Sequence, residues 1–345
     1  MKIAFPCPIL ARVMDRLRRA FLELSIAAAV CFFAVNATQA ADKKDSSQEF
    51  LKAADLTDIR SPGSPAFELD AKVNIYAGNG TAVPGSYKLI WLSPSEWREE
   101  LTYSGYTRVR VGGEDKYWQQ RSPDYESLQI TELSLAIDFS SSLRGEQSPG
   151  KLKSRKHFGV TLDCAAGDGL PHRDYCFSPT DGVLMQEDTV DGPVPYSFQY
   201  SNFLSLGQRR FPGTIRVTAG DSPLADFSIE RLVNIEATSS DDFSPPQGAS
   251  LWLTCANPER PAGLDKVAPE YPVTDRLAGH QGIVVMYAVI AQDGSVQNVH
   301  ILGAPSRGLA DAAFAAVRQW RYKPRRCGGT PTPTETIISI AFTLG

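Results

Sequence analysis

Hydrophobic and polar positions alternate with a period of two through much of the chain. The first such run places Phe67, Leu69, Ala71, Val73 and Ile75 between polar residues. This alternation is typical of a strand with one buried face. Further runs of this kind occupy residues 87–91, 97–103, 107–111, 157–162, 183–190, 196–204, 210–217 and 227–235. Successive antiparallel strands must close or be covered on one face, so this region predicts a large curved sheet.

Three segments depart from that period. Residues 128–139 mix helical and strand spacings, which favours a helix. Residues 41–65 are polar and rich in Pro and Gly, and they predict a linker with one short helix at Gln48–Leu56. Residues 239–261 are rich in Ser, Asp and Pro and predict a second linker, in which Leu251–Cys255 favours a short strand.

The C-terminal part has a different order of elements. A nearly continuous apolar strand at 283–290 is followed by the turn Gln292–Ser295 and a returning strand at 296–302. Apolar residues at helical spacing predict a helix from Leu309 to Trp320, ended by Lys323-Pro324. Residues 336–344 alternate again. The order strand, strand, helix, strand predicts a small α+β domain.

The first 40 residues combine a basic start, an apolar run and small residues. The apolar run from Leu24 to Val35 is too short to cross a hydrocarbon core of roughly 30 Å. We therefore predict a secretory signal cleaved near Ala40, and a periplasmic protein. The alternative is an uncleaved anchor in the inner membrane, with the span lengthened by Phe21-Leu22.

Cysteine usage agrees with export. Four cysteines remain after the signal, and an even number in an exported chain favours disulfides. Cys164 and Cys176 close a short loop, which leaves Cys255 to pair with Cys327. The alternative is a metal site at Cys164, His172 and Cys176, but this spacing lacks the Cys-x-x-Cys pair of most structural zinc sites. We predict no metal and no cofactor.

Charge and motifs exclude several function classes. A net charge of −4 and a pI near 5.7 give no electrostatic case for binding nucleic acid. The sequence contains four histidines, none in a zincin motif, and it has no Gly-x-Ser-x-Gly elbow and no phosphate-binding loop. We assign no catalytic residue and predict that the protein is not an enzyme.

Four short motifs give residues 262–345 a family resemblance. They are Tyr271-Pro272, Gly282, Asp293-Gly294 and Trp320–Pro324. Together they resemble the C-terminal domain of the TonB energy-transducer family. In that family the last strand is a sheet edge, to which a short N-terminal segment of an outer-membrane receptor adds as a further strand.

The resemblance implies a partner-binding edge in the last strand. Its residues are Thr336, Ile337, Ile338, Ser339, Ile340, Ala341, Phe342 and Thr343. The alternative is that this strand only completes the core. An ordinary transducer also has a membrane anchor and a long Pro-rich spacer, whereas this chain has a short apolar run and a globular domain. The difference puts force transduction in doubt but leaves peptide capture intact.

Residues 66–238 are similar to the half-barrel of periplasmic lipoprotein carriers of the LolA and RseB groups. The similarity rests on the strand at Phe67, the hairpin from Trp91 to Trp97 and the motif Phe211–Val217. It implies a curved sheet that wraps a helix and leaves an apolar cavity for acyl chains. Aromatic residues that would line this cavity include Trp91, Trp97, Tyr117 and Trp118. The alternative is that they fill an ordinary core.

The sequence thus predicts a mainly β protein, an antiparallel half-barrel followed by a small TonB-like α+β domain. The predicted divisions are 1–40 signal, 41–65 linker, 66–238 half-barrel, 239–261 linker and 262–345 C-terminal domain. The predicted function is strand addition by a segment of an outer-membrane transporter or another envelope protein. The alternative is a periplasmic carrier or sensor that binds a lipid or acyl ligand in the half-barrel.

Overall fold

The computed structural model describes residues 47–344, except 78, 114, 158, 170–171, 191–194, 237–239 and 255–260. The predicted signal, residues 1–40, lies outside the described residues. Among the helices of the described part, none is both long enough and apolar enough to cross a membrane.

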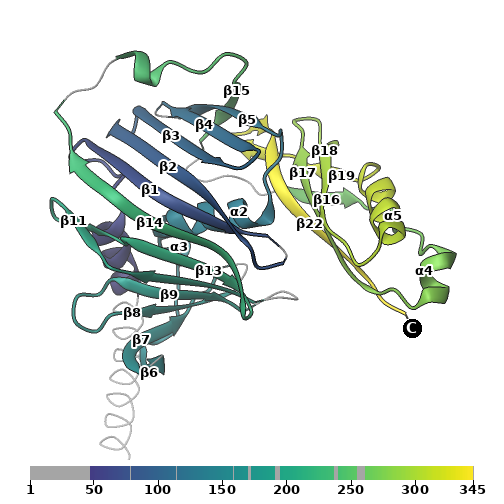
Figure 1. Cartoon of the computed structure of the whole chain (residues 1–345), viewed down its shortest axis with the longest axis horizontal. Helices are drawn as coiled ribbons and strands as arrows, with labels where there is room; N and C mark the ends of the chain where they lie inside the picture. The colour runs from purple at the N-terminus through teal and green to yellow at the C-terminus, as the bar shows by residue number, and fades with distance from the viewer. Residues whose placement is uncertain are drawn as a thin grey trace, which may run out of the picture.

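Most described strands belong to one antiparallel sheet of thirteen strands, in the order β15-β5-β4-β3-β2-β1-β14-β13-β10-β9-β8-β7-β6. Their bounds are β1 (Phe67–Tyr76), β2 (Ala82–Ser93), β3 (Glu96–Tyr103), β4 (Tyr106–Gly112), β5 (Lys116–Ser122), β6 (Lys153–His157), β7 (Val160–Ala166), β8 (Arg173–Phe177), β9 (Leu184–Thr189), β10 (Tyr196–Ser201), β13 (Thr214–Ala219), β14 (Ser222–Asn234) and β15 (Ser250–Leu253). A small hairpin, β11 (Leu204–Leu206) and β12 (Arg209–Phe211), and a 3-10 turn, η1 (Ser240–Phe243), lie outside this ladder. Figure 1 shows that the sheet curves around the helices α2 (Leu128–Ile137) and α3 (Phe139–Gly145). We call this unit the half-barrel.

The alternating residues of β1 explain why the sheet closes on a core. Phe67, Leu69 and Val73 are at most 1% exposed, while the polar residues that alternate with the apolar ones reach solvent. A helix at residues 47–57 adds Phe50, which packs edge-on against Tyr175, with ring centroids 5.1 Å apart. Full burial of each such side chain stabilises the fold by roughly 1.5–3 kcal/mol. The predicted antiparallel half-barrel around a helix is confirmed.

The predicted helix at 128–139 forms in two pieces. Ser127 caps α2 by accepting a hydrogen bond from the Ile130 backbone amide at 3.4 Å. Asp138 leaves the helical conformation and separates α2 from α3. The predicted strand at 157–162 is instead a hairpin of two strands, β6 and β7, with Gly159 at a positive φ in the turn.

The C-terminal part folds around a second core. Its main sheet has the order β18-β17-β22. The bounds of its elements are β16 (Ala262–Asp265), α4 (Val273–Ala278), β17 (Gly282–Ile290), β18 (Val296–Gly303), α5 (Arg307–Val317), β19 (Arg321–Lys323), β20 (Arg325–Cys327), β21 (Thr330–Thr332) and β22 (Thr334–Phe342). In Figure 1, α5 covers the face of this sheet that is turned away from the half-barrel. The predicted α+β domain is therefore present.

Two details of the β17–β18 hairpin set the direction of its side chains. Gly294 has a φ of +81° and lies so close to Tyr322 that a Cβ would sit 1.9 Å from the Tyr322 carbonyl oxygen, so only glycine fits this turn. Asn298 has a φ of 47°, and the register with β17 shifts here. This irregularity lets Val296 and Val299, three residues apart, pack on the same core. His300 is thereby directed to the opposite face, toward the half-barrel.

Candidate partner-binding edge

The last strand, β22, lies at the edge of the C-terminal sheet. It pairs with β17 without a bulge, from Phe342 opposite Gly282 to Thr334 opposite Ile290. Among the described strands, β17 is the only ladder partner of β22. The other side of β22 therefore presents backbone amides and carbonyls that no described strand pairs with. We call this side, from Ile337 to Phe342, the open flank.

The two faces of β22 have different surroundings. Ile338, Ile340 and Phe342 are buried in the core beneath α5. Ser339 and Ala341 point to the other face and are exposed. The strand is thus held firmly on one face and along one side, while its second face is accessible at the C-terminal end. A partner strand would meet a rigid template there.

The segment leading into the domain supports the same end of β22. Tyr271 packs edge-on against Phe342, with ring centroids 5.4 Å apart, and Pro272 precedes α4 at its N-cap. Asp275 accepts hydrogen bonds from Ser306 and from His280 Nδ1, and these bonds lower the pKa of its carboxyl. Asp275 thereby links α4 to the start of α5. The predicted entry motif, Tyr271-Pro272, therefore packs against the C-terminal end of β22, beside the open flank.

The N-terminal end of β22 contacts the half-barrel. Arg121 of β5 forms a 2.7 Å ion pair with Glu335 and donates a hydrogen bond to the Tyr287 hydroxyl. Gln119 donates to Glu335 at 3.2 Å. Burial alone would lower the pKa of Arg121, but the Glu335 carboxylate raises it, so Arg121 stays charged.

A second contact joins the half-barrel to the opposite edge strand, β18. Tyr125 stacks on His300 with ring centroids 4.2 Å apart, and His300 Nε2 lies 3.4 Å from a carboxylate oxygen of Asp124. We name the contacts of Arg121 and Tyr125 with Glu335, Tyr287 and His300 the latch. The latch contacts lie at one end of the sheet face that α5 does not cover.

A comparison with protein families identifies this domain. Residues 267–344 match the family model described as Gram-negative bacterial TonB protein C-terminal. Residues 267–344 form a TonB-type C-terminal domain. The resemblance predicted from Tyr271-Pro272, Gly282 and the later motifs is confirmed. None of the curated proteins matches the sequence.

Solved structures resemble each part separately. The TonB C-terminal domain of Pseudomonas aeruginosa is 26% identical, with a TM-score of 0.22, over 24% of this chain and 86% of that one. A LolA superfamily protein from Nitrosomonas europaea is 10% identical, with a TM-score of 0.39, over 57% and 97% of the two chains. A DUF1329 family protein from Desulfovibrio piger is 11% identical, with a TM-score of 0.43, over 59% of this chain and 97% of that one.

A buried cluster of charges inside the half-barrel continues from the latch. Arg108, 2% exposed, forms 2.7 Å ion pairs with Glu99 and with Glu126. Glu126 also lies 3.3 Å from Arg110 and 3.5 Å from Arg121. A continuous series of ion pairs, from Arg108 through Glu126 to Arg121, therefore extends from the half-barrel interior to β22. No local sequence pattern predicts this cluster, because Glu99, Arg108 and Glu126 come from β3, β4 and the segment before α2.

The cluster stays ionised although it is buried. Burial raises the pKa of Glu126, but Arg108 and Arg110 outweigh it and hold that pKa at about 2. The pKa of Glu99 is also lowered, because Arg108, Arg110 and Arg60 overcome the effect of burial. The charges line a cavity of about 260 Å³ between β2, β3, β4 and α2. Such paired charges tolerate burial only while every partner is present.

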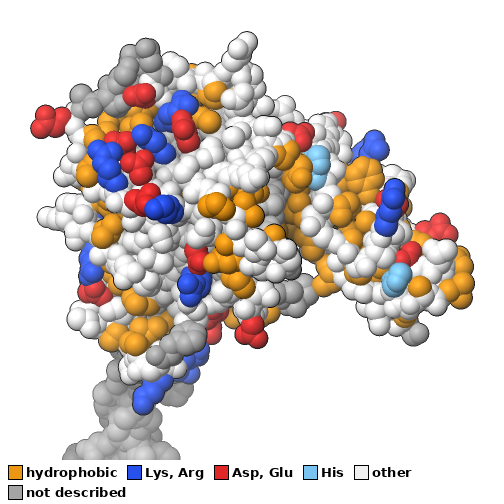
Figure 2. Space-filling model, in the orientation of Figure 1, with side chains coloured by type: hydrophobic (Ala, Val, Ile, Leu, Met, Phe, Trp, Pro, Cys, Tyr) orange, Lys and Arg blue, Asp and Glu red, His pale blue; other side chains and the backbone are white. Residues whose placement is uncertain are grey.

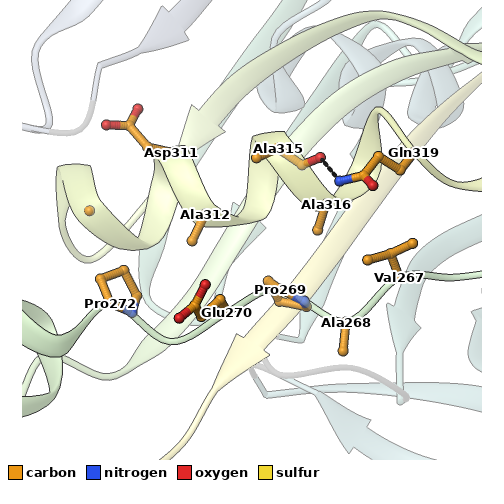
Figure 3. Close-up of a pocket in the computed structure, with 11 residues that line it drawn as sticks. Val267, Ala268, Pro269, Glu270, Pro272, Asp311, Ala312, Ala315, Ala316 and Gln319 are labelled. Atoms are coloured by element: carbon orange, nitrogen blue, oxygen red, sulfur yellow. Dashed lines mark hydrogen bonds between the residues drawn. The ribbon is translucent and has the colours of Figure 1, made fainter.

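The TonB-type domain has a separate groove on the α5 side. It measures about 710 Å³ and lies between α5 and the segment 267–272. Figure 3 shows small side chains of α5, Ala312 and Ala316, facing Pro269 across it. This groove is on the face of the sheet opposite the latch. It is distinct from the open flank.

The predicted cavity aromatics occupy two faces of the half-barrel sheet. Trp91 is buried and stacks on Phe67, with ring centroids 5.8 Å apart. The rings of Trp97 and Tyr117 lie side by side, with centroids 6.3 Å apart. Trp118 follows Tyr117 in β5 and thus points to the other face, where Lys116 lies over its ring. Trp118 therefore does not share a face with Tyr117, and the acyl cavity stays a prediction.

The structure pairs Cys164 with Cys176 in a disulfide between β7 and β8. His157 Nε2 lies 3.6 Å from the Cys176 sulfur. With the two sulfurs bonded to each other, the thiolates that a metal would need are not present. Cys327 is also in a disulfide, and its predicted partner Cys255 lies outside the described residues.

Proposed function

We propose that this protein is a non-catalytic binding protein of the cell envelope. It captures an extended segment of another envelope protein, and an outer-membrane transporter is the expected partner. The segment adds to the open flank of β22 as a fourth strand of the TonB-type sheet. The observation that carries the proposal is that β22 pairs with β17 on one side only, within the described strands.

The geometry of β22 suits this mode of binding. Main-chain hydrogen bonds to the open flank would supply affinity, and alternate side chains of β22 would select the partner's side chains. The core beneath α5 fixes β22, so little ordering of the protein is needed when a partner binds. Ser339 and Ala341 are small and exposed, and they leave room for larger partner residues.

Two proline variants test the proposal. The amides of neighbouring residues in a strand point to opposite sides, so one of Ile340 and Ala341 directs its amide toward β17 and the other toward the open flank. Ala291 uses both its amide and its carbonyl in the β17–β18 turn, so Ile290 and every second residue before it face β22, and the amide of Ala341 points to the open flank. We expect Ile340→Pro to lower the melting temperature, because Ile340 is buried and its amide is in the β17 ladder. Ala341→Pro, at an exposed position, should keep the wild-type melting temperature. That variant should bind the partner at least about tenfold more weakly, a loss of about 1.4 kcal/mol.

The binding measurement uses synthetic peptides that copy the N-terminal periplasmic segments of the organism's outer-membrane transporters, titrated by fluorescence anisotropy. Gly303→Ala is the control, because Gly303 ends β18 and a Cβ there meets no atom within 4 Å. Unchanged affinity in the stable proline variant would show that the peptide binds elsewhere.

A further inference from the structure

We propose that the half-barrel limits the partner segment to the part of β22 from Ile337 to Phe342, by means of the latch. The inference rests on the proposed function and adds the length, the register and the chemistry of the segment. The coverage of the first residues of β22 is a property of the protein alone and can be tested without a partner.

Burial changes along β22 in the way that this limit requires. Thr334, Glu335 and Thr336 are half-buried next to the half-barrel, whereas Ser339 and Ala341 are exposed. Ile337, also half-buried, lies at the boundary between the two parts. The Thr334 hydroxyl is out of contact with solvent. Glu335 is held by Arg121, whose side chain is only 7% exposed. The first residues of β22 are therefore covered, and the rest of the strand is accessible.

The latch contacts are strong enough to keep a partner strand from pairing with the N-terminal end of β22. Arg121 is bound to Glu335 and Tyr287 at once, and its guanidinium lies 5.2 Å from the centre of the Tyr287 ring. Tyr287 is 1% exposed. Removing a partner from such a buried, charged contact leaves the other group uncompensated. A peptide that extended past Ile337 would have to displace these contacts.

The uncovered part of the sheet face is apolar. Near the open flank it carries Ile283 and Val285 from β17 and Ile337 and Ala341 from β22, with Ser339 between them. None of these side chains is charged. Figure 2 shows apolar side chains gathered in the recess between the larger body and the smaller lobe. A strand added to β22 would direct every second side chain into this recess.

The partner segment is defined by these limits. It spans about six residues, or roughly 20 Å of extended chain. Its side chains facing the recess are apolar, with β-branched residues preferred, because they pack beside Ile337 and Ala341. A charged side chain facing the recess would have no partner among these uncharged side chains, so we expect none there.

Amide hydrogen exchange of the protein alone tests the limit. We expect the outward amides of residues 334–336 to exchange at least about tenfold more slowly than those of the open flank. Glu335→Gln and Tyr125→Ala should each weaken the latch and bring both groups to similar rates. Glu230→Gln, which removes a surface ion pair with Lys72 on the outside of the half-barrel, is the matched control. Equal rates in the wild-type protein would overturn the inference.

Exchange in the presence of a transporter-segment peptide gives the second readout. The peptide should protect residues 337–342 in the wild-type protein and extend its protection to 334–336 in Glu335→Gln. Protection over 334–342 in the wild-type protein would also overturn the inference. Slow exchange at 334–336 in the free protein, without any peptide protection, would support the limit while contradicting the proposed function.

Discussion

Replacing Arg108 by methionine is expected to lower the free energy of unfolding by about 3–5 kcal/mol. Methionine keeps much of the length of the side chain but removes both 2.7 Å ion pairs, to Glu99 and to Glu126. Both carboxylates are at most 5% exposed, so water cannot replace the lost partner. Urea denaturation at pH 7 measures the loss.

A surface pair gives the matched control for this effect. Arg216, 59% exposed at its side chain, pairs with Asp226 at 3.0 Å, and Arg216→Met should cost less than about 1 kcal/mol. Adding Glu99→Gln and Glu126→Gln to Arg108→Met should restore part of the stability, because the uncompensated charges are removed. If Arg108→Met costs no more than Arg216→Met, the cluster does not have the role assigned to it.

The acid limb of the stability curve follows from the same cluster. The pKa of Glu126 is about 2 in the folded protein, below its usual value of 4.5. Its contribution is therefore present above pH 4.5 and lost as the pH falls toward 2. In Arg108→Met the folded-state pKa of Glu126 rises, so the decline in stability between pH 4.5 and 2 should be shallower.

Replacing Glu132 by glutamine is expected to stabilise the protein above pH 7 by up to about 3 kcal/mol. Glu132 lies on α2 facing the sheet and is 8% exposed. Burial raises its pKa to about 7, and Arg173 opposes the shift only in part, because Arg173 is paired with Glu187.

The sign of the effect follows from the raised pKa. The unfolded chain ionises Glu132 near pH 4.5, whereas the folded protein keeps it protonated up to about pH 7. Wild-type stability should therefore fall as the pH rises from 4.5 to 7 and then remain lower. Glu132→Gln should match the wild type at pH 4 and exceed it at pH 8. Equal stability of the two proteins at pH 8 would show that Glu132 ionises without cost.

The strands with one apolar face were predictable from the sequence, since alternation and burial coincide in them. The residues Phe67 to Ile75 show this in β1, and Ile338 to Phe342 show it in β22. The motifs of the TonB-type domain were also sufficient to place β22 last in the domain. Local patterns succeed where a single core determines which face is buried.

Other features depend on contacts that no local pattern contains. In β4, arginines alternate with valines, yet Arg108 points into the half-barrel because it pairs there with Glu99 and Glu126. The predicted helix from Leu309 to Trp320 ends at Val317 instead, because Trp320 turns into the core and donates to the Val267 carbonyl. The latch joins Arg121 to Glu335, two residues far apart in the sequence.

The most direct test of the account is a photo-crosslink from the open flank in intact cell envelopes. A benzoylphenylalanine at Ser339, exposed on β22, should crosslink to a short extended segment of one envelope protein, mapped by mass spectrometry. The same group at Gln297, exposed on the opposite edge strand β18, should not. Equal crosslinking from both positions, or none from Ser339, would contradict capture of a partner strand by β22.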